Sequence, residues 1–234
     1  MYIFYTPELD SNDFTLNEEE SKHCSKVLRL GIGDRVHLID GRGGLYEAEI
    51  SSLQKKNVLL KIVSKQFGFG KRNHHLHIAI APTKNIDRLE WFLEKATEIG
   101  IDEITPIICD RSERKIIKEE RLDKVITAAV KQSLTAYHPK LNETISLNDF
   151  LKREFDGAKL IAHCMEDGSK QFISELLETH QSYLVLIGPE GDFSPAELVN
   201  ALRSGFKPVT LGTTRLRTET AALAACFEVN YLNR

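Results

Sequence analysis

The chain has 234 residues, of which 41% are hydrophobic and 28% are charged. This usage excludes a disordered chain and a collagen-like repeat, and the length allows one large domain or a small domain joined to a medium one. The chain has 31 Lys and Arg against 34 Asp and Glu, a formal net charge of −3. A nucleic-acid binder is expected to be basic overall, so one with this charge must concentrate its basic residues locally.

No feature of the sequence indicates a membrane, secretion or a metal. No apolar stretch approaches the roughly 20 residues that span a bilayer, and the first residues lack the basic and apolar regions of a signal peptide. The four cysteines are too far apart to suggest zinc ligands or a disulfide framework. His74, His75 and His77 lie together without a nearby acidic or cysteine partner in the sequence. We therefore expect a cytoplasmic protein with free thiols and no bound metal.

The first part of the chain has the pattern of a small β domain. Acidic residues 18–20 open a short helical pattern that carries His23 and Val27. The sequence then predicts strands over 35–39, 45–53 and 58–63, separated by turns at 31–34, 41–44 and 54–57. Short strands at this spacing suggest a small barrel, and we expect it to occupy residues 1–68.

A glycine-rich and polar stretch over residues 64–75 marks the predicted boundary. Beyond it the pattern alternates between strands and helices, which predicts a second domain over 74–234. The expected strands are 76–81, 104–109, 159–164, 183–188 and 207–211, and the expected helices are 87–99, 118–133, 171–179, 195–204 and 219–232. This alternation is typical of an α/β fold with a mainly parallel sheet covered by helices on both faces.

One loop whose residues could bind a ligand follows the strand that ends at Ile187. Gly188-Pro-Glu-Gly191 combines glycines, which permit close approach of a ligand to the backbone, with a carboxylate that could fix a hydroxyl or an amine. Ser194 is predicted to cap the next helix, with Pro195 at its first position and Glu197 completing a capping box. An ordinary, well-capped strand-to-helix loop stays an alternative.

A second loop, residues 211–221, also follows a strand and leads into a helix. It carries Arg215 and Arg217 close to Glu219. In an open α/β sheet both loops gather at the carboxyl edge, where ligands bind; the alternative is a solvated salt bridge. Neither loop matches a P-loop or a dinucleotide fingerprint, and no nucleophile elbow is present, which disfavours kinase, dehydrogenase and hydrolase functions.

Taken together, Ile187-Gly-Pro-Glu-Gly-Asp-Phe-Ser-x-x-Glu197 and Leu211-Gly-x-x-x-Leu-Arg-x-Glu-Thr-Ala221 resemble the paired C-terminal motifs of the SPOUT methyltransferases. The sequence is most similar to the bacterial 16S ribosomal RNA uracil-N3 methyltransferase family. That family's other marks follow in order: His23-x-x-x-Val27-Leu-Arg29, Gly31-x-Gly33-Asp34, Thr83-Lys84, Lys95-Ala-Thr-Glu98-Ile-Gly100, Arg111-Ser-Glu-Arg114 and Lys131-Gln-Ser133. The sequence departs from the pattern at Lys131-Gln-Ser-Leu-Thr135, where the family often has Glu-Gln-Ser-Gly-Arg. It also has Tyr2 and Tyr5 where the family often has an arginine.

The resemblance implies an N-terminal PUA-like β-barrel and a SPOUT-type α/β methyltransferase domain with a C-terminal trefoil knot. It also implies a homodimer, S-adenosyl-L-methionine as cofactor, and 16S ribosomal RNA within the small ribosomal subunit as partner. The implied cofactor-binding residues are His163, Ile187, Gly188, Pro189, Glu190, Gly191, Leu211, Gly212, Leu216, Arg217 and Thr218.

For the reaction implied, uridine N3 must lose its proton before it can accept a methyl group. Arg217 is the candidate to stabilise charge on the uracil oxygens, because a guanidinium stays cationic and donates in a fork. Glu219 is the nearest candidate to accept the proton or to orient Arg217. The candidate RNA contacts are His23, Lys26, Arg29, Lys84, Arg111 and Arg114. Alternatives are another SPOUT methyltransferase acting on the ribose 2′-oxygen or another base position, a non-catalytic ribosome-assembly factor, and a small-molecule transferase.

Overall fold

The computed structural model describes residues 2–54, 57–165 and 168–234, and the chain divides into two compact units. The first unit comprises Met1–Lys71 and Thr127–His138, and the second comprises Arg72–Ile126 and Pro139–Arg234. Helix α3 (Glu119–Ser133) begins in the second unit and ends in the first. The first unit therefore includes a segment that lies far beyond residue 68 in the sequence.

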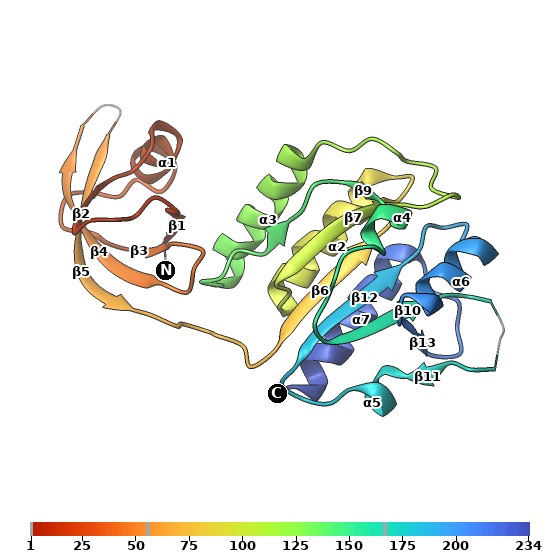
Figure 1. The fold of residues 1–234 in the computed structure, drawn as a ribbon. Coiled ribbons are helices and arrows are strands. Elements are labelled where there is room, and N and C mark those ends of the chain that lie inside the picture. The colour runs from red at the N-terminus through yellow and green to blue at the C-terminus, as the bar shows by residue number, and fades with distance from the viewer. Residues whose placement is uncertain (1, 55–56, 166–167) are drawn as a thin grey trace. The chain divides into compact units, whose positions relative to one another are not determined.

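The first unit is built on a curled five-stranded sheet with the order β1-β3-β4-β5-β2 (Figure 1). Its strands are β1 (Ile3–Tyr5), β2 (Asp13–Thr15), β3 (Arg35–Ile39), β4 (Leu45–Leu53) and β5 (Val58–Gln66). Two register shifts between β4 and β5 interrupt their antiparallel pairing, and such irregularities increase the local twist. Phe4, Leu38, Ile50 and Leu60 are fully buried in its core. The curled sheet is consistent with a PUA-like half-barrel.

The predicted N-terminal helix is present, but it changes from an α-helix to a π-helix after Lys22. Asn17 caps helix α1 (Glu18–Lys22) by accepting the Glu20 N–H at 2.8 Å, and a π-helix (His23–Val27) follows directly. Arg29, just beyond it, has φ +57°, a left-handed conformation that is uncommon for a residue other than glycine. In the predicted turn 54–57, residues 55 and 56 lie outside the described part of the chain.

The second unit contains a sheet in which every pairing between described strands is parallel. The strand order is β11-β13-β10-β12-β6-β7-β8, and β9 also pairs with β7. The strands are β6 (His75–Ile80), β7 (Glu103–Ile108), β8 (Lys140–Leu141), β9 (Ile145–Ser146), β10 (Ala158–Ala162), β11 (Gln171–Phe172), β12 (Ser182–Ile187) and β13 (Lys207–Thr210). Because parallel strands all end at one edge, the loops after β6, β7, β10, β12 and β13 converge there.

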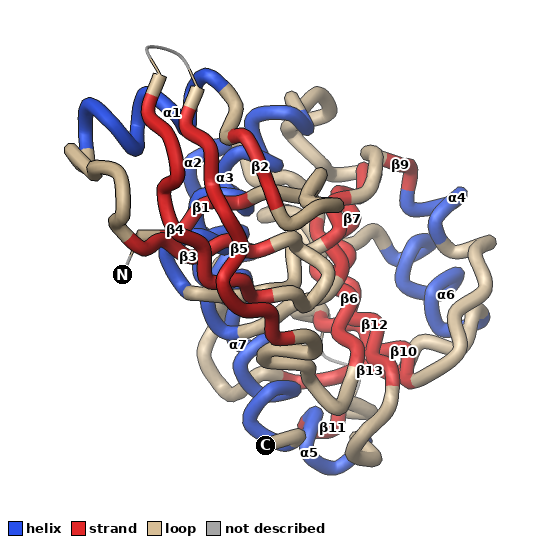
Figure 2. Tube along the Cα trace, turned by 90° about the vertical axis from the view of Figure 1, so that its left-hand side faces the viewer, coloured by secondary structure: helices blue, strands red, loops and turns tan. Residues whose placement is uncertain are grey.

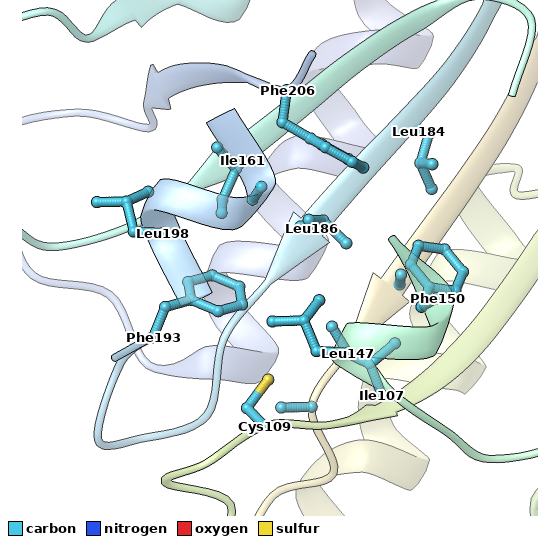
Figure 3. Close-up of a cluster of buried hydrophobic side chains, with 13 residues drawn as sticks. Ile107, Cys109, Leu147, Phe150, Ile161, Leu184, Leu186, Phe193, Leu198 and Phe206 are labelled. Carbon is cyan, nitrogen blue, oxygen red and sulfur yellow. The ribbon is translucent and has the colours of Figure 1, made fainter. Parts of the chain in front are cut away.

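Helices cover both faces of this sheet (Figure 2). Helices α2 (Ile86–Ile99) and α7 (Thr218–Leu232) lie on one side, and α4 (Leu147–Phe150) and α6 (Pro195–Arg203) lie on the other. On the α4 and α6 side, a buried cluster that includes Ile161, Leu186 and Phe193 fills the space between helices and strands (Figure 3). The predicted α/β fold class is therefore confirmed.

The helix predicted over 171–179 is present but shorter than expected. Gln171 and Phe172 instead form β11, which pairs with Val209 and Thr210 of β13, and only Ile173–Leu176 forms a helix, α5. Pairing to a strand distant in sequence here overrides the local helical pattern.

A buried polar network lies near the amino end of β6. The His77 side chain is buried, and its Nε2 lies 2.7 Å from the Thr105 hydroxyl, which accepts a hydrogen bond from Asn142 Nδ2 at 2.7 Å. The Thr105 hydroxyl therefore has a polar partner on each of two other residues. Burial lowers the pKa of His77 from 6.5 to about 4, although the Glu103 carboxylate acts in the opposite direction. His77 is therefore neutral in the folded protein near pH 7.

Candidate functional site

The loop between β12 and α6 is fixed by its helix cap. Ser194 Oγ accepts the Glu197 N–H, while Glu197 Oε2 accepts the Ser194 N–H at 2.8 Å, and Pro195 occupies the first turn. The predicted capping box is therefore confirmed. Glu197 also accepts the Asp110 N–H through Oε1 at 2.8 Å, which ties the loop after β7 to the start of α6.

The loop between β6 and α2 is held by side chains from two other loops. Glu190 Oε1 accepts the main-chain N–H of Lys84 at 2.9 Å. Arg114 donates to the carbonyl oxygens of Thr83, at 3.1 Å, and Lys84, at 2.7 Å. The groups of this loop that bind Glu190 and Arg114 all belong to its main chain, so these two side chains fix the path of its backbone.

The start of α7 is tied to the β12 loop. Thr218 Oγ1 donates to the carbonyl oxygen of Gly188 at 3.1 Å in a buried hydrogen bond. Arg217, at the N-cap position, is exposed and makes no side-chain hydrogen bond or ion pair with the described residues. Glu219 is buried, and its ion-pair partner is Arg88 of α2, at 3.8 Å, rather than Arg217.

Two adjoining cavities lie where these loops meet, with volumes of about 650 and 220 Å³. Their shared lining includes Cys164, Asp192, Leu216 and Ala221. Asp192 has φ +62° and accepts the Cys164 N–H at 3.0 Å, so the loop after β10 is fixed to the β12 loop. Cavities that hold small molecules are usually about 300–1,000 Å³, so a nucleoside-sized ligand fits the larger one.

Every residue that the sequence predicts for cofactor binding lines one of these cavities. The larger is lined by His163, Gly191, Leu211, Gly212 and Leu216, and the smaller by Ile187, Gly188, Pro189, Glu190, Leu216, Arg217 and Thr218, among others. Glu219, the predicted proton acceptor, lines neither. Cys164, Met165 and Lys170 also line the larger cavity but are not predicted from the sequence, because no motif marks the loop after β10 and only strand order brings it here. Asp192, also not predicted as a site residue, lies within the motif that follows β12.

The predicted RNA-contact residues fall in two groups. Arg111 lines the larger cavity and donates to the Gly191 carbonyl at 2.9 Å; Arg114 and Lys84 lie on the neighbouring loops, and the Lys84 ammonium pairs with Glu113 at 2.7 Å. The other group, His23, Lys26 and Arg29, belongs to the first unit. Of these, His23 and Lys26 line an open hollow whose wall also includes Glu18, Glu19, Lys22 and Val27.

The main chain at the cavity wall suits a nucleoside ligand. The N–H groups of Thr213–Leu216 make no hydrogen bond within the described residues and are available as donors. Gly212 has φ +122° and open space where a side chain would project. The fold and the cavities therefore define an α/β protein with a candidate ligand site between loops at the carboxyl edge of a parallel sheet.

Comparison with known proteins gives the family. The model of the RNA methyltransferase domain matches residues 71–230, and that of the RNA methyltransferase PUA domain matches residues 16–63. The chain is 32% identical to Ribosomal RNA small subunit methyltransferase E of Rickettsia conorii, over 95% of this chain and 91% of that protein. The chain therefore belongs to the RNA methyltransferase family and carries that family's PUA domain.

Two solved structures agree with this assignment over the full chain. A protein from Porphyromonas gingivalis, described as a probable rRNA-methyltransferase, is 39% identical, with a TM-score of 0.92 over 100% of this chain and 98% of that one. Ribosomal RNA small subunit methyltransferase E from Neisseria gonorrhoeae, bound to S-adenosyl methionine, is 26% identical, with a TM-score of 0.89 over 100% and 98%. Within the described residues, no helix is long and apolar enough to cross a membrane.

Proposed function

We propose that this enzyme transfers a methyl group from S-adenosyl-L-methionine to N3 of a uridine in 16S ribosomal RNA of the small ribosomal subunit. Family membership and the relatives' printed names support the RNA substrate and the cofactor. The observation that carries the cofactor assignment is the pair of cavities, because all the residues expected to bind it line their walls. S-adenosylmethionine supplies, when bound, an electrophilic methyl group on a sulfonium.

The smaller cavity has at its wall an arginine that could stabilise negative charge on the uracil. Arg217 lies at its wall with its guanidinium unpaired within the described chain, and a guanidinium can bind the carbonyl oxygens of a uracil as negative charge develops there. Main-chain groups of 187–191 and 211–216 would hold the adenosine part of the cofactor, with His163 at the wall of the larger cavity.

The RNA is proposed to bind through basic residues of both parts of the chain. Residues 1–68 serve as the PUA-like RNA-binding domain, with His23, Lys26 and Arg29 as contacts, and residues 74–234 serve as the methyltransferase domain, with Lys84, Arg111 and Arg114. Although the net charge is −3, the lysines and arginines among these residues supply local positive charge for phosphates. A ribosomal RNA substrate supports a cytoplasmic location for the protein.

A homodimer is proposed on the basis of an apolar face on α7. Phe227 and Tyr231 are 58% and 51% exposed and stack on each other, and Trp91 of the adjacent helix α2 is 42% exposed. Large aromatic side chains exposed together are typical of a protein–protein interface. The trefoil knot stays a prediction from the family resemblance.

Two measurements test the proposed function. Calorimetry should detect binding of S-adenosylmethionine to the purified protein. Mass spectrometry of 16S ribosomal RNA from a strain lacking the gene should show loss of one N3-methyluridine, restored by the wild-type gene. Loss of a ribose-methylated nucleotide instead would support the alternative SPOUT activity. Cofactor binding without any loss of methylation would contradict the enzymatic assignment.

The role of Arg217 has its own test. Arg217→Ala should abolish methyl transfer, while the Kd for S-adenosylmethionine stays nearly unchanged, because the guanidinium acts on the uracil. Equal loss of both would show that Arg217 is a structural or cofactor residue. Arg203→Ala is the matched control, since Arg203 is an exposed arginine in the last turn of α6 and lines neither cavity.

A further inference from the structure

The two carboxylate oxygens of Glu190 have different surroundings. Oε1 accepts the Lys84 N–H at 2.9 Å, whereas Oε2 is buried and has no hydrogen-bond partner among the described residues. A buried carboxylate oxygen without a donor is unfavourable, and native proteins keep few such groups. This oxygen is therefore suited to accept a donor that a ligand brings.

Glu190 lies where such a ligand would bind. It lines the smaller cavity together with Arg217, whereas Glu219 lines neither cavity and faces Arg88. The other carboxylate at this wall, Asp192, already accepts the Cys164 N–H through Oδ2. Glu190 is thus the carboxylate that combines a cavity position with a buried, unpartnered oxygen.

The position of Glu190 is maintained by the neighbouring loop. The Lys84 N–H that binds Oε1 belongs to a backbone segment whose carbonyl oxygens, on Thr83 and Lys84, accept from Arg114. A carboxylate fixed in this way needs little reorganisation during a reaction, which is the condition for efficient proton transfer and electrostatic stabilisation.

We propose that Glu190 Oε2 accepts the proton of uracil N3 during methyl transfer, an inference that rests on the proposed function. The N3–H bond breaks and an O–H bond forms at Oε2, while the N3 electron pair bonds to the methyl carbon as its bond to sulfur breaks. Arg217 stabilises the negative charge that develops on the uracil oxygens. The proton passes from Oε2 to water when the product leaves, which restores the carboxylate.

The test compares Glu190→Gln with Glu113→Gln. The glutamine at position 190 keeps an oxygen for the Lys84 N–H and loses the basic carboxylate, and Glu113 is a carboxylate on a neighbouring loop, paired with the Lys84 side chain. The kcat of each is measured on small ribosomal subunits at saturating RNA and cofactor across neutral to alkaline pH. Calorimetry gives the Kd for S-adenosylmethionine, and circular dichroism checks folding.

Near pH 7, Glu190→Gln should lower kcat by about 10²–10⁴-fold, the usual contribution of a general base, with the cofactor Kd changed less than about threefold. Its kcat should then rise about tenfold per pH unit, because hydroxide replaces the missing base, while the wild-type profile is flatter. Glu113→Gln should keep kcat within about threefold of the wild type.

Several results would overturn the assignment. They are an unchanged kcat in Glu190→Gln, a loss of activity that does not vary with pH, a Kd that rises in proportion to the loss, and a pH-dependent loss in Asp192→Asn alone. If the wild type produces N3-methyluridine, these results reject only the role of Glu190. A wild-type product methylated at another atom rejects the proposed function itself, and the proton transfer with it.

Discussion

The carboxylate of Glu197 should contribute strongly to stability, because it accepts hydrogen bonds from the main chain of two loops. Its side chain is buried, and its oxygens accept the main-chain N–H groups of Ser194 and Asp110, both at 2.8 Å. Glu197→Ala leaves both N–H donors without an acceptor, and each buried donor left without a hydrogen bond costs about 1–3 kcal/mol. Since both bonds are only partly buried, we expect the free energy of unfolding to fall by about 2–4 kcal/mol.

Urea unfolding followed by circular dichroism measures this change, and Glu175→Ala is the matched control. Glu175 also accepts the N–H of its helix's cap residue, Phe172, at 2.8 Å, but in an exposed hydrogen bond. Its loss should therefore cost no more than about 0.5 kcal/mol. Equal effects of the two substitutions, or a loss below about 0.5 kcal/mol for Glu197→Ala, would refute the argument that burial and the second donor set the magnitude.

Three further predictions concern pH, ligand affinity and assembly. Acid should lower the free energy of unfolding by about 3 kcal/mol between pH 6.5 and 4. The reason is that His77 has a pKa of 6.5 in the unfolded chain but of about 4 in the folded protein, so the unfolded chain takes up the proton first as the pH falls. His77→Gln should flatten this dependence in acid titrations of stability, and an unchanged slope would contradict it. Thr218→Val removes the hydrogen bond to Gly188 and should weaken S-adenosylmethionine binding about 2–10-fold in calorimetry. A Kd equal to that of the wild type would show that this hydrogen bond does not maintain the binding site. Phe227→Asp should convert a dimer to monomer in sedimentation, and a monomeric wild type would contradict the proposed face.

Much of the fold could be predicted because its causes are local. The period of apolar residues predicted the strand Arg35–Ile39 with its observed bounds, and helix α2 to within one residue. The capping box at Ser194 and Glu197 was also predicted, because each partner lies within one helical turn of the other. Patterns of this kind depend on neighbours along the chain, so the sequence alone contains them.

The site was predictable only in part. The glycine-containing loops after β12 and β13 carry recognisable motifs, and all the residues expected to bind the cofactor line the cavities. The partners of the charged groups were not predictable. Glu219 faces Arg88, more than a hundred residues earlier in the chain, and Glu190 binds the main chain of Lys84.

The sequence by itself determined the two kinds of architecture, the two motif loops and the family resemblance, because periodicity, caps and motifs depend on short separations along the chain. The tertiary structure decided the strand order, which brings the loops after β6, β7, β10, β12 and β13 to one edge. It also decided that Glu190, and not Glu219, lies at the wall of a cavity. Burial and long-range hydrogen bonding, which no local pattern encodes, are the physical reason for that difference.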